Sequence, residues 1–192
     1  MKNYIIIFAL IFSFQYTKAQ DFKTTEKYIA VSKLITKQQD YTTNQIDIVA
    51  LNDTSKKIAT IQVPDLDFFE ELRITVLPNP NLKDVNEVIK VELEYNACCI
   101  NTETYYFLAK NNEDYVALPS IQNTYCDTSV TSVKYIFPSE AFGQTNTILT
   151  AAIKQTTRPN IKGIDILKQM VWNDDDFYPN NTITATYTQT KY

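Results

Sequence analysis

The run from residue 89 to residue 99 constrains the fold of this chain more than any other part of its sequence. One parity of the run is apolar and comprises Ile89, Val91, Leu93, Tyr95, Ala97 and Cys99. The other parity is mostly polar and comprises Lys90, Glu92, Glu94, Asn96 and Cys98. Since successive side chains of a strand point to opposite faces of a sheet, this alternation predicts a strand with one buried and one solvated face.

Short segments rich in β-branched and aromatic residues recur along the rest of the chain, separated by turn-forming residues. They predict further strands at 28–34, 45–51, 57–63, 72–77, 104–110, 115–118, 121–126, 133–137, 147–153, 164–172 and 182–190. Helical segments are expected to be short, at 65–72 and 139–142. We therefore expect an all-β protein, an antiparallel β-sandwich or open β-barrel of roughly 8–12 strands with at most short helices.

Residues 1–19 have the composition of a cleavable secretory signal. Lys2 supplies a positive start, residues 4–14 are almost uninterruptedly apolar, and residues 17–19 form a small-residue cleavage site. The apolar run is about 11 residues long, whereas a transmembrane helix needs roughly 20. We expect cleavage after Ala19, no membrane span afterwards, a single β-rich domain at 20–192, and a secreted or periplasmic location.

Charge and glycine content narrow the possible partners and cofactors. The formal net charge of the chain is −4, and cleavage would take it to −6 by removing Lys2 and Lys18. An acidic product argues against nucleic acid as a partner. The two glycines of the chain are too few for Gly-rich phosphate loops or dinucleotide fingerprints, so we expect no such cofactor.

The chain contains no histidine, which excludes several catalytic arrangements. Ser-His-Asp and Cys-His nucleophiles, the common zinc hydrolase sites and the usual proton shuttle all need one. Glycoside hydrolysis needs only two carboxylates, and the acidic pairs are Glu70 with Glu71 and Glu92 with Glu94. The alternation places Glu92 and Glu94 on a solvated strand face. We therefore predict no catalytic residue and no metal site.

Three cysteines predict one disulfide and one free thiol, because export leads to a compartment that permits disulfides. Neighbouring strand residues point to opposite faces, so only one of Cys98 and Cys99 can meet Cys126. Parity places Cys98 and Cys126 on the more polar faces, and we predict that they pair. A bulge after Ala97 would instead join Cys99 to Cys126, and a vicinal Cys98–Cys99 bridge or a three-thiolate metal site are further alternatives.

The segment after Trp172 combines acidic and aromatic residues. Asp174 and Asp176 could supply oxygen ligands to calcium, although the run lacks the glycine and the later glutamate of a calcium loop. Trp172, Phe177 and Tyr178 could offer flat faces to a sugar ring. The alternative is a polar hairpin loop between two terminal strands, with Trp172 in the core.

A series of motifs lies between residues 91 and 138. It comprises Cys98-Cys99, Thr104-Tyr105-Tyr106, the segment 114–119, Tyr125-Cys126-Asp127 and Tyr135-Ile136-Phe137-Pro138. With these motifs and a signal that ends in Ala19-Gln20, the chain resembles small secreted proteins of Gram-negative bacteria for which no activity is known. The resemblance implies a bacterial envelope setting and no particular functional residue.

Export, acidity, the absence of histidine and the shortage of glycine together favour a binding protein. We expect a non-enzymatic β-domain that binds a protein partner in the cell envelope or outside it. A carbohydrate-binding module that uses residues 172–178 is the alternative, and a carboxylate-dependent glycan hydrolase is the second alternative.

Overall fold

The protein folds as antiparallel β-structure. A computed structural model describes residues 19–38, 41–63, 67–111, 114–126, 130–155, 161–173, 176–179 and 185–187. Most of these residues lie in strands, every strand pair is antiparallel, and no helix occurs among them. None of them therefore forms a helix that could cross a membrane. The prediction of an all-β antiparallel protein is confirmed.

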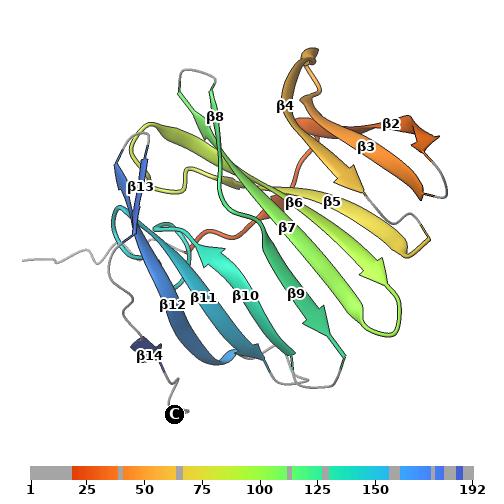
Figure 1. The fold of residues 1–192 in the computed structure, drawn as a ribbon. Helices are drawn as coiled ribbons and strands as arrows, with labels where there is room; N and C mark the ends of the chain where they lie inside the picture. The colour runs from red at the N-terminus through yellow and green to blue at the C-terminus, as the bar shows by residue number, and fades with distance from the viewer. Residues whose placement is uncertain are drawn as a thin grey trace, which may run out of the picture.

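The strands form three sheets (Figure 1). The central sheet contains β1 (Lys23–Thr24), β5 (Phe69–Pro78), β6 (Val85–Asn96), β7 (Ile100–Lys110), β8 (Tyr115–Ala117) and β9 (Ile121–Tyr125). A three-stranded meander contains β2 (Tyr28–Gln38), β3 (Tyr41–Ala50) and β4 (Asp53–Val63). The C-terminal sheet contains β10 (Val130–Ile136), β11 (Thr147–Gln155), β12 (Ile161–Asn173), β13 (Asp176–Pro179) and β14 (Ala185–Tyr187). Each predicted strand has a counterpart among the described residues, although 182–184 and 188–190 of the predicted strand 182–190 lie outside them, and β1 and β13 are additional.

A side chain links the central sheet to the C-terminal sheet. Asn123 of β9 donates from Nδ2 to the carbonyl oxygen of Val133 at 3.0 Å, and its Oδ1 accepts from the Val133 N–H at 2.6 Å. The amide of Asn123 thus replaces a backbone peptide beside β10. The two sheets lie side by side at this seam, without closing into a barrel within the described strands (Figure 1).

The first core lies between the central sheet and the C-terminal sheet. Its buried members are Leu77, Leu82, Val85, Val88, Tyr106, Leu108, Leu118, Ile121, Tyr135, Phe137, Ile148, Met170 and Trp172. Aromatic rings pack edge to face there, with the Tyr106 and Tyr135 centroids 5.0 Å apart. Phe22, just before β1, packs against Tyr106 and Phe137 and so brings the N-terminal segment into this core.

The second core lies between the opposite face of the central sheet and the meander. Its buried members are Tyr28, Ile46, Ile48, Ala50, Ile61, Val63, Val76, Ile89, Val91, Leu93, Phe107 and Ala109. The predicted apolar face of β6 is confirmed at Ile89, Val91 and Leu93, which are fully buried. The opposite face of β6, which was predicted to be solvated, is only partly exposed. Glu92 and Glu94 are half-buried there, because this face of the sheet also carries the first core.

A third cluster lies within the C-terminal sheet. Its buried members come from β10, β11 and β12 and are Ile136, Leu149, Ala151, Ile153, Ile164 and Ile166.

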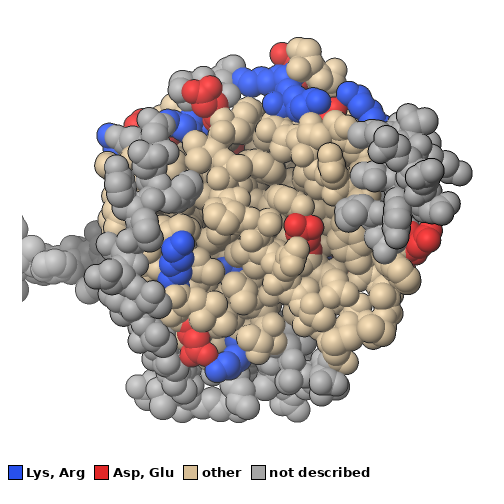
Figure 2. Space-filling model, viewed as in Figure 1, with Lys and Arg blue, Asp and Glu red and all other residues tan. Residues whose placement is uncertain are grey.

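In the view of Figure 1 the middle of the molecular surface is mostly uncharged, and basic side chains gather at the upper edge, near β4 (Figure 2). Neither sign of charge dominates the face in view.

Both helix predictions are wrong where the structure describes them. Residues 69–72 belong to β5, since pairing with β6 determines their conformation. Residues 138–142 form successive turns, in which Glu140 N–H donates to Phe137 and Gly143 N–H donates to Glu140. A Cβ at position 143 would collide with the backbone oxygen of Phe137, so these turns require glycine there.

Glu140 stabilises the same turns. Its carboxylate accepts a hydrogen bond from the Phe137 N–H at 2.9 Å and lies 3.8 Å from the Lys134 ammonium. The side chain is buried beside the first core, and burial raises its pKa above the usual value. Burial therefore disfavours the ionised form of Glu140 relative to a solvent-exposed carboxyl group.

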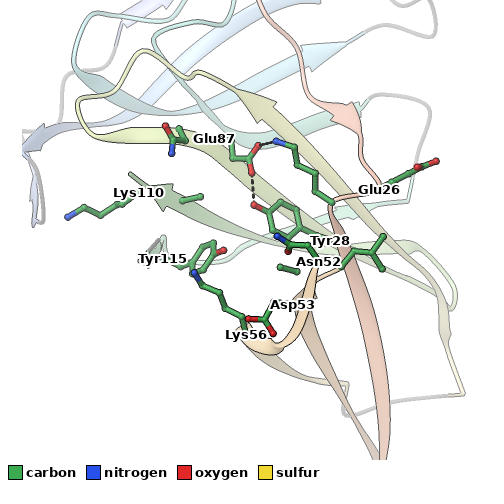
Figure 3. Close-up of a pocket in the computed structure, with 13 residues that line it drawn as sticks. Glu26, Tyr28, Asn52, Asp53, Lys56, Glu87, Lys110 and Tyr115 are labelled. Atoms are coloured by element: carbon green, nitrogen blue, oxygen red, sulfur yellow. Dashed lines mark hydrogen bonds and ion pairs between the residues drawn. The ribbon is translucent and has the colours of Figure 1, made fainter. Parts of the chain in front are cut away.

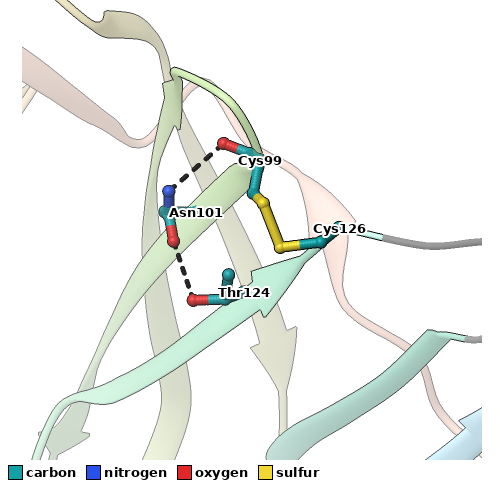
Figure 4. The surroundings of a disulfide bond; sticks show 4 residues. All are labelled: Cys99, Asn101, Thr124 and Cys126. Carbon is teal, nitrogen blue, oxygen red and sulfur yellow. Dashed lines mark hydrogen bonds between the residues drawn. A yellow bond between two sulfur atoms is a disulfide. The ribbon is translucent and has the colours of Figure 1, made fainter.

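The disulfide joins Cys99 to Cys126, and Cys98 is a free, exposed thiol (Figure 4). The preferred prediction, Cys98–Cys126, is wrong because β6 ends at Asn96 and the alternation stops in the turn that follows. Ile100 pairs with Tyr125, and the same register extended by one residue places Cys99 opposite Cys126, with Cα atoms 4.7 Å apart. The alternative that the sequence left open is the observed one.

Hydrogen bonds brace the strands beside the disulfide. Asn101 donates from Nδ2 to the Cys99 carbonyl at 3.2 Å, and Thr124 Oγ1 donates to Asn101 Oδ1 at 2.7 Å (Figure 4). The covalent bond and this small network fasten the end of β9 to the start of β7.

Candidate functional site

A cleft of about 690 Å³ opens where the meander meets the central sheet (Figure 3). Five chain segments line it: the start of β2, the β3–β4 turn, the start of β6, the end of β7, and β8. Its acidic and basic residues are Glu26, Asp53, Glu87, Lys27, Lys56 and Lys110. The remaining residues of the lining are Tyr28, Tyr115, Asn52, Asn86, Ala50, Leu51 and Ala109.

A buried carboxylate lies on one side of the cleft. Glu87 is 8% exposed and shares the parity of Ile89 and Val91, so β6 directs its side chain toward the meander. Its Oε1 accepts a hydrogen bond from the Tyr28 hydroxyl at 2.5 Å, and its Oε2 lies 2.7 Å from the Lys27 ammonium. Both partners come from the start of the meander, so this network joins the two layers (Figure 3).

The Tyr28 hydroxyl acts as a hydrogen-bond donor. Burial of the ring raises the pKa of Tyr28 far above its usual value, and the hydrogen bond to Glu87 and the charge of Glu87 raise it further. The phenol is therefore protonated near neutral pH. Tyr28 can position Glu87, and it cannot serve as a base near neutral pH.

Tyr115 and Lys56 form the opposite wall. The Lys56 ammonium lies 5.7 Å from the centroid of the Tyr115 ring, which is a cation–π contact between β4 and β8 (Figure 3). The ring of Tyr115 also packs against the second core. This wall thus has an aromatic base and a charged tip.

The β3–β4 turn forms a third side of the cleft. Asp53 accepts hydrogen bonds from the Ser55 N–H at 3.1 Å and from Ser55 Oγ at 2.6 Å, and the side-chain hydrogen bond lowers the pKa of Asp53. The Leu51 N–H donates to the Lys27 carbonyl at 2.8 Å and so ties the turn to the start of β2. The Leu51 side chain is 52% exposed and presents apolar surface to the cleft.

A second polar network lies on the outer face of the meander, away from the cleft. Asp47 of β3 is 2% exposed and lies 2.8 Å from the Lys33 ammonium of β2 and 3.0 Å from that of Lys57 in β4. It also accepts from Thr60 Oγ1 at 2.6 Å. The hydrogen bond from Lys33, followed by those from Thr60 and Lys57, holds the pKa of Asp47 well below its usual range. This network joins all three strands of the meander.

Trp172 lies in the first core and not in a binding loop. Its side chain is 1% exposed, and its indole Nε1–H donates to the Lys83 carbonyl at 2.8 Å. The hypothesis that its ring offers a face to a sugar is therefore wrong for this structure. The alternative, a core tryptophan, is what the structure shows.

The other residues of that hypothesis lie mostly beyond what the structure describes. The backbone of 176–179 forms β13, in which Phe177 pairs with Trp172 and Tyr178 with Val171. Asp174, and the side chains of Asp176, Phe177 and Tyr178, lie outside the described residues. Within the described residues, no group of three or more Cys, Asp and Glu side chains could hold a metal ion.

The two acidic pairs meet on the central sheet. Glu71 lies opposite Glu94 and Arg73 lies opposite Glu92 in the β5–β6 register. The Arg73 guanidinium lies 2.6 Å from Glu71 and 3.3 Å from Glu92, and the hydrogen bond to Glu71 raises its pKa. Glu71 and Glu92 are thus partners of Arg73 in a surface ion-pair network, which accounts for these two carboxylates without a catalytic role.

Sequence reasoning missed the cleft because its residues come from five separate segments. One local signal pointed to it: Glu87 is a charged residue at the apolar parity of β6, two positions before Ile89. A charge at a buried position needs a partner, and partners for buried charges are often part of a site. Neither Tyr28 nor Tyr115 carries a comparable signal in the sequence.

Comparison with known proteins adds no further information about this cleft. The chain matches no family model, no curated protein and no solved structure. The assignment of function consequently depends on the geometry described above.

Proposed function

We propose that this chain is an exported binding protein that takes its ligand in the cleft between the meander and the central sheet. The observation that carries the proposal is the cleft itself, about 690 Å³ in volume with the buried Glu87–Tyr28 pair on one side. Clefts of roughly 300–1,000 Å³ are typical of ligand sites. A few polar groups held rigidly among packed side chains are what such sites use for specificity.

Export is part of the proposal. Residues 1–19 have the anatomy of a secretory signal, and the Cys99–Cys126 disulfide is of the kind that persists in oxidising compartments. A secreted or periplasmic setting accommodates both features.

The cleft supports binding in preference to chemistry. Its buried carboxylate already accepts from Tyr28 and pairs with Lys27, and the raised pKa of Tyr28 removes that phenol from acid–base work near neutral pH. An interface with a folded protein partner would normally involve about 20–30 residues on each side. The cleft is lined by 13 residues and so favours a smaller occupant. Binding of a protein partner, which the sequence led us to expect, is the competing proposal.

Titration of the purified 20–192 chain, followed by NMR, tests the proposal. The panel should contain oligosaccharides and short peptides, with Tyr115→Ala as the cleft variant. Tyr125→Ala is the control, because Tyr125 is also half-buried but lies on β9 beside the disulfide. We expect saturable binding that Tyr115→Ala abolishes and Tyr125→Ala preserves. Binding that ignores Tyr115→Ala, or the appearance of reaction products, would contradict the proposal.

A further inference from the structure

We propose that the occupant of the cleft is an uncharged sugar chain, an inference that rests on the proposed function and specifies its ligand class. The lining brings three carboxylates, three ammonium groups, two amides and two phenols to one cleft. Within this set, Glu87 and Lys27 neutralise each other at 2.7 Å. The ligand therefore meets polar groups of both signs and no excess of either.

Charge balance separates the possible ligands. An anionic ligand would approach Glu87 and Asp53, and a cationic ligand would approach Lys27 and Lys56. Either one would lose by repulsion part of what it gains by attraction. A polyhydroxylated ligand carries no net charge, and each of its hydroxyls both donates and accepts hydrogen bonds.

Glu87 has acceptor capacity beyond its present partners. Each of its two oxygens has one partner, Tyr28 or Lys27, whereas a carboxylate offers about four lone-pair sites. A hydroxyl placed in the cleft can donate to one of the remaining sites. Because the carboxylate is 8% exposed and held by Tyr28, it is pre-organised for that hydrogen bond.

The neighbouring groups suit the rest of a sugar ring. Asn52 and Asn86 offer amides that both donate and accept, and exposed Leu51 offers apolar surface to the ring's C–H groups. The ring of Tyr115 adds an aromatic face, whereas Ala50 and Ala109 are buried and contribute little. Polar groups and apolar faces together suit a sugar ring, which carries hydroxyls on its edge and C–H groups on its faces.

An extended peptide is the competing occupant. Among the described residues β4 pairs with β3 alone and β8 with β7 alone, so both have a free edge near the cleft. A peptide that binds by strand addition would depend on those edges and little on Glu87. The role of Glu87 therefore distinguishes the two occupants.

The test is titration of the 20–192 chain with three probe sets: neutral oligosaccharides of glucose, mannose and N-acetylglucosamine, oligogalacturonates as anionic sugars, and a pool of short random peptides. Glu87→Gln is the principal variant, because glutamine keeps an acceptor for Tyr28 and loses the charge. Glu92→Gln is its matched control, since Glu92 is a half-buried, lysine-paired carboxylate of the same strand on the opposite face. Asn52→Ala, at an exposed turn position, is the second variant should Glu87→Gln fail to fold.

We expect a neutral oligosaccharide to shift the methyl resonances of Leu51, Ala50 and Ala109. Its affinity should fall about tenfold or more in Glu87→Gln, fall less in Asn52→Ala, and stay unchanged in Glu92→Gln. Preference for oligogalacturonates overturns the inference. Binding of peptides alone at the cleft overturns it and preserves the proposed function, and the absence of cleft shifts with all three probe sets overturns both.

Discussion

The two faces of the central sheet are covered in different ways. The C-terminal sheet covers one face and contributes large side chains, including Trp172 and Phe137, whereas the meander covers the other with isoleucine and valine side chains such as Ile48 and Val63. The C-terminal sheet packs against its face through the first core, whereas the meander leaves a cleft with charged and polar side chains where the β3–β4 turn reaches β6. The contrast thus places the largest buried aromatic side chains on one face and the proposed binding cleft on the other.

The two sides of the molecule also differ in how the pKa of a carboxyl group is shifted. On the first face Glu140 is buried with a pKa raised by desolvation, and on the meander side Asp47 has a pKa lowered by its lysine and threonine partners. The two carboxylates should therefore change stability in opposite directions as pH changes. Five substitutions test the contrast between the two faces of the central sheet. Their expected effects on stability decrease from the first to the last.

Replacement of Trp172 by alanine should cost most. Trp172 is 1% exposed, so Trp172→Ala removes a large buried side chain and leaves a cavity, at about 3–5 kcal/mol of unfolding free energy. Urea unfolding measures the loss. Leu167→Ala on the same strand is the control, since Leu167 is 42% exposed and should change stability little. Equal losses in the two variants would contradict the assignment of Trp172 to the core.

Loss of the disulfide should cost nearly as much. Cys99→Ser opens a cross-link between residues 27 apart in sequence, which the chain-entropy model values at about 3–4 kcal/mol. Cys98→Ser removes an exposed free thiol and should stay within about 0.5 kcal/mol of the parent. Thermal unfolding of the two variants compares them directly. The reverse order of stabilities would support Cys98–Cys126 pairing.

Tyr28→Phe tests the contact between the meander and the central sheet. It removes the hydroxyl that donates to buried Glu87 and should cost about 1–3 kcal/mol, because the carboxylate loses a donor that water replaces poorly. Lys27→Met should cost less, about 1 kcal/mol at most, because the Lys27 side chain is 67% exposed. Chemical denaturation of both variants at neutral pH provides the measurement.

Asp47→Asn should destabilise the protein near neutral pH and progressively less in acid. The pKa of Asp47 is lower in the folded chain than in the unfolded chain. Its contribution to stability is therefore present above about pH 4 and is lost as pH falls through the lower, folded value. Unfolding free energies measured from pH 7 to pH 2 should converge for parent and variant, and parallel curves would contradict the assignment.

Glu140→Gln should show the opposite, smaller trend. Burial raises the pKa of Glu140 in the folded chain, so the ionised form is disfavoured there. Below about pH 4, Glu140 is protonated in both the folded and the unfolded chain, and its contribution to the stability of the parent is fully present. This contribution is lost as pH rises through the pKa of the folded chain. Relative to the parent, Glu140→Gln should therefore gain stability as pH rises above about 4, measured by the same titration.

The fold was predictable from the sequence because strand alternation is a local signal. Ile89, Val91 and Leu93 form the buried face that their spacing indicates. Two predictions depended on where a strand ends, and both went wrong at that point. The Cys98–Cys126 pairing assumed that β6 continues past Asn96, and the 139–142 helix assumed a regular turn where Gly143 and Glu140 impose another conformation.

The site was less predictable because it depends on contacts distant in sequence. Tyr28 and Glu87 are 59 residues apart, and no local pattern pairs them before the strands are ordered in space. Trp172 attracted a functional interpretation because of its acidic neighbours, yet its hydrogen bond to Lys83 spans 89 residues and places it in the core. Register and layer packing decide both cases.

The seam at Asn123 has a consequence for strand addition. Asn123 bonds both backbone groups of Val133, so β10 lies along the edge of β9 that β7 leaves unpaired. A strand edge covered in this way is protected against pairing with another chain.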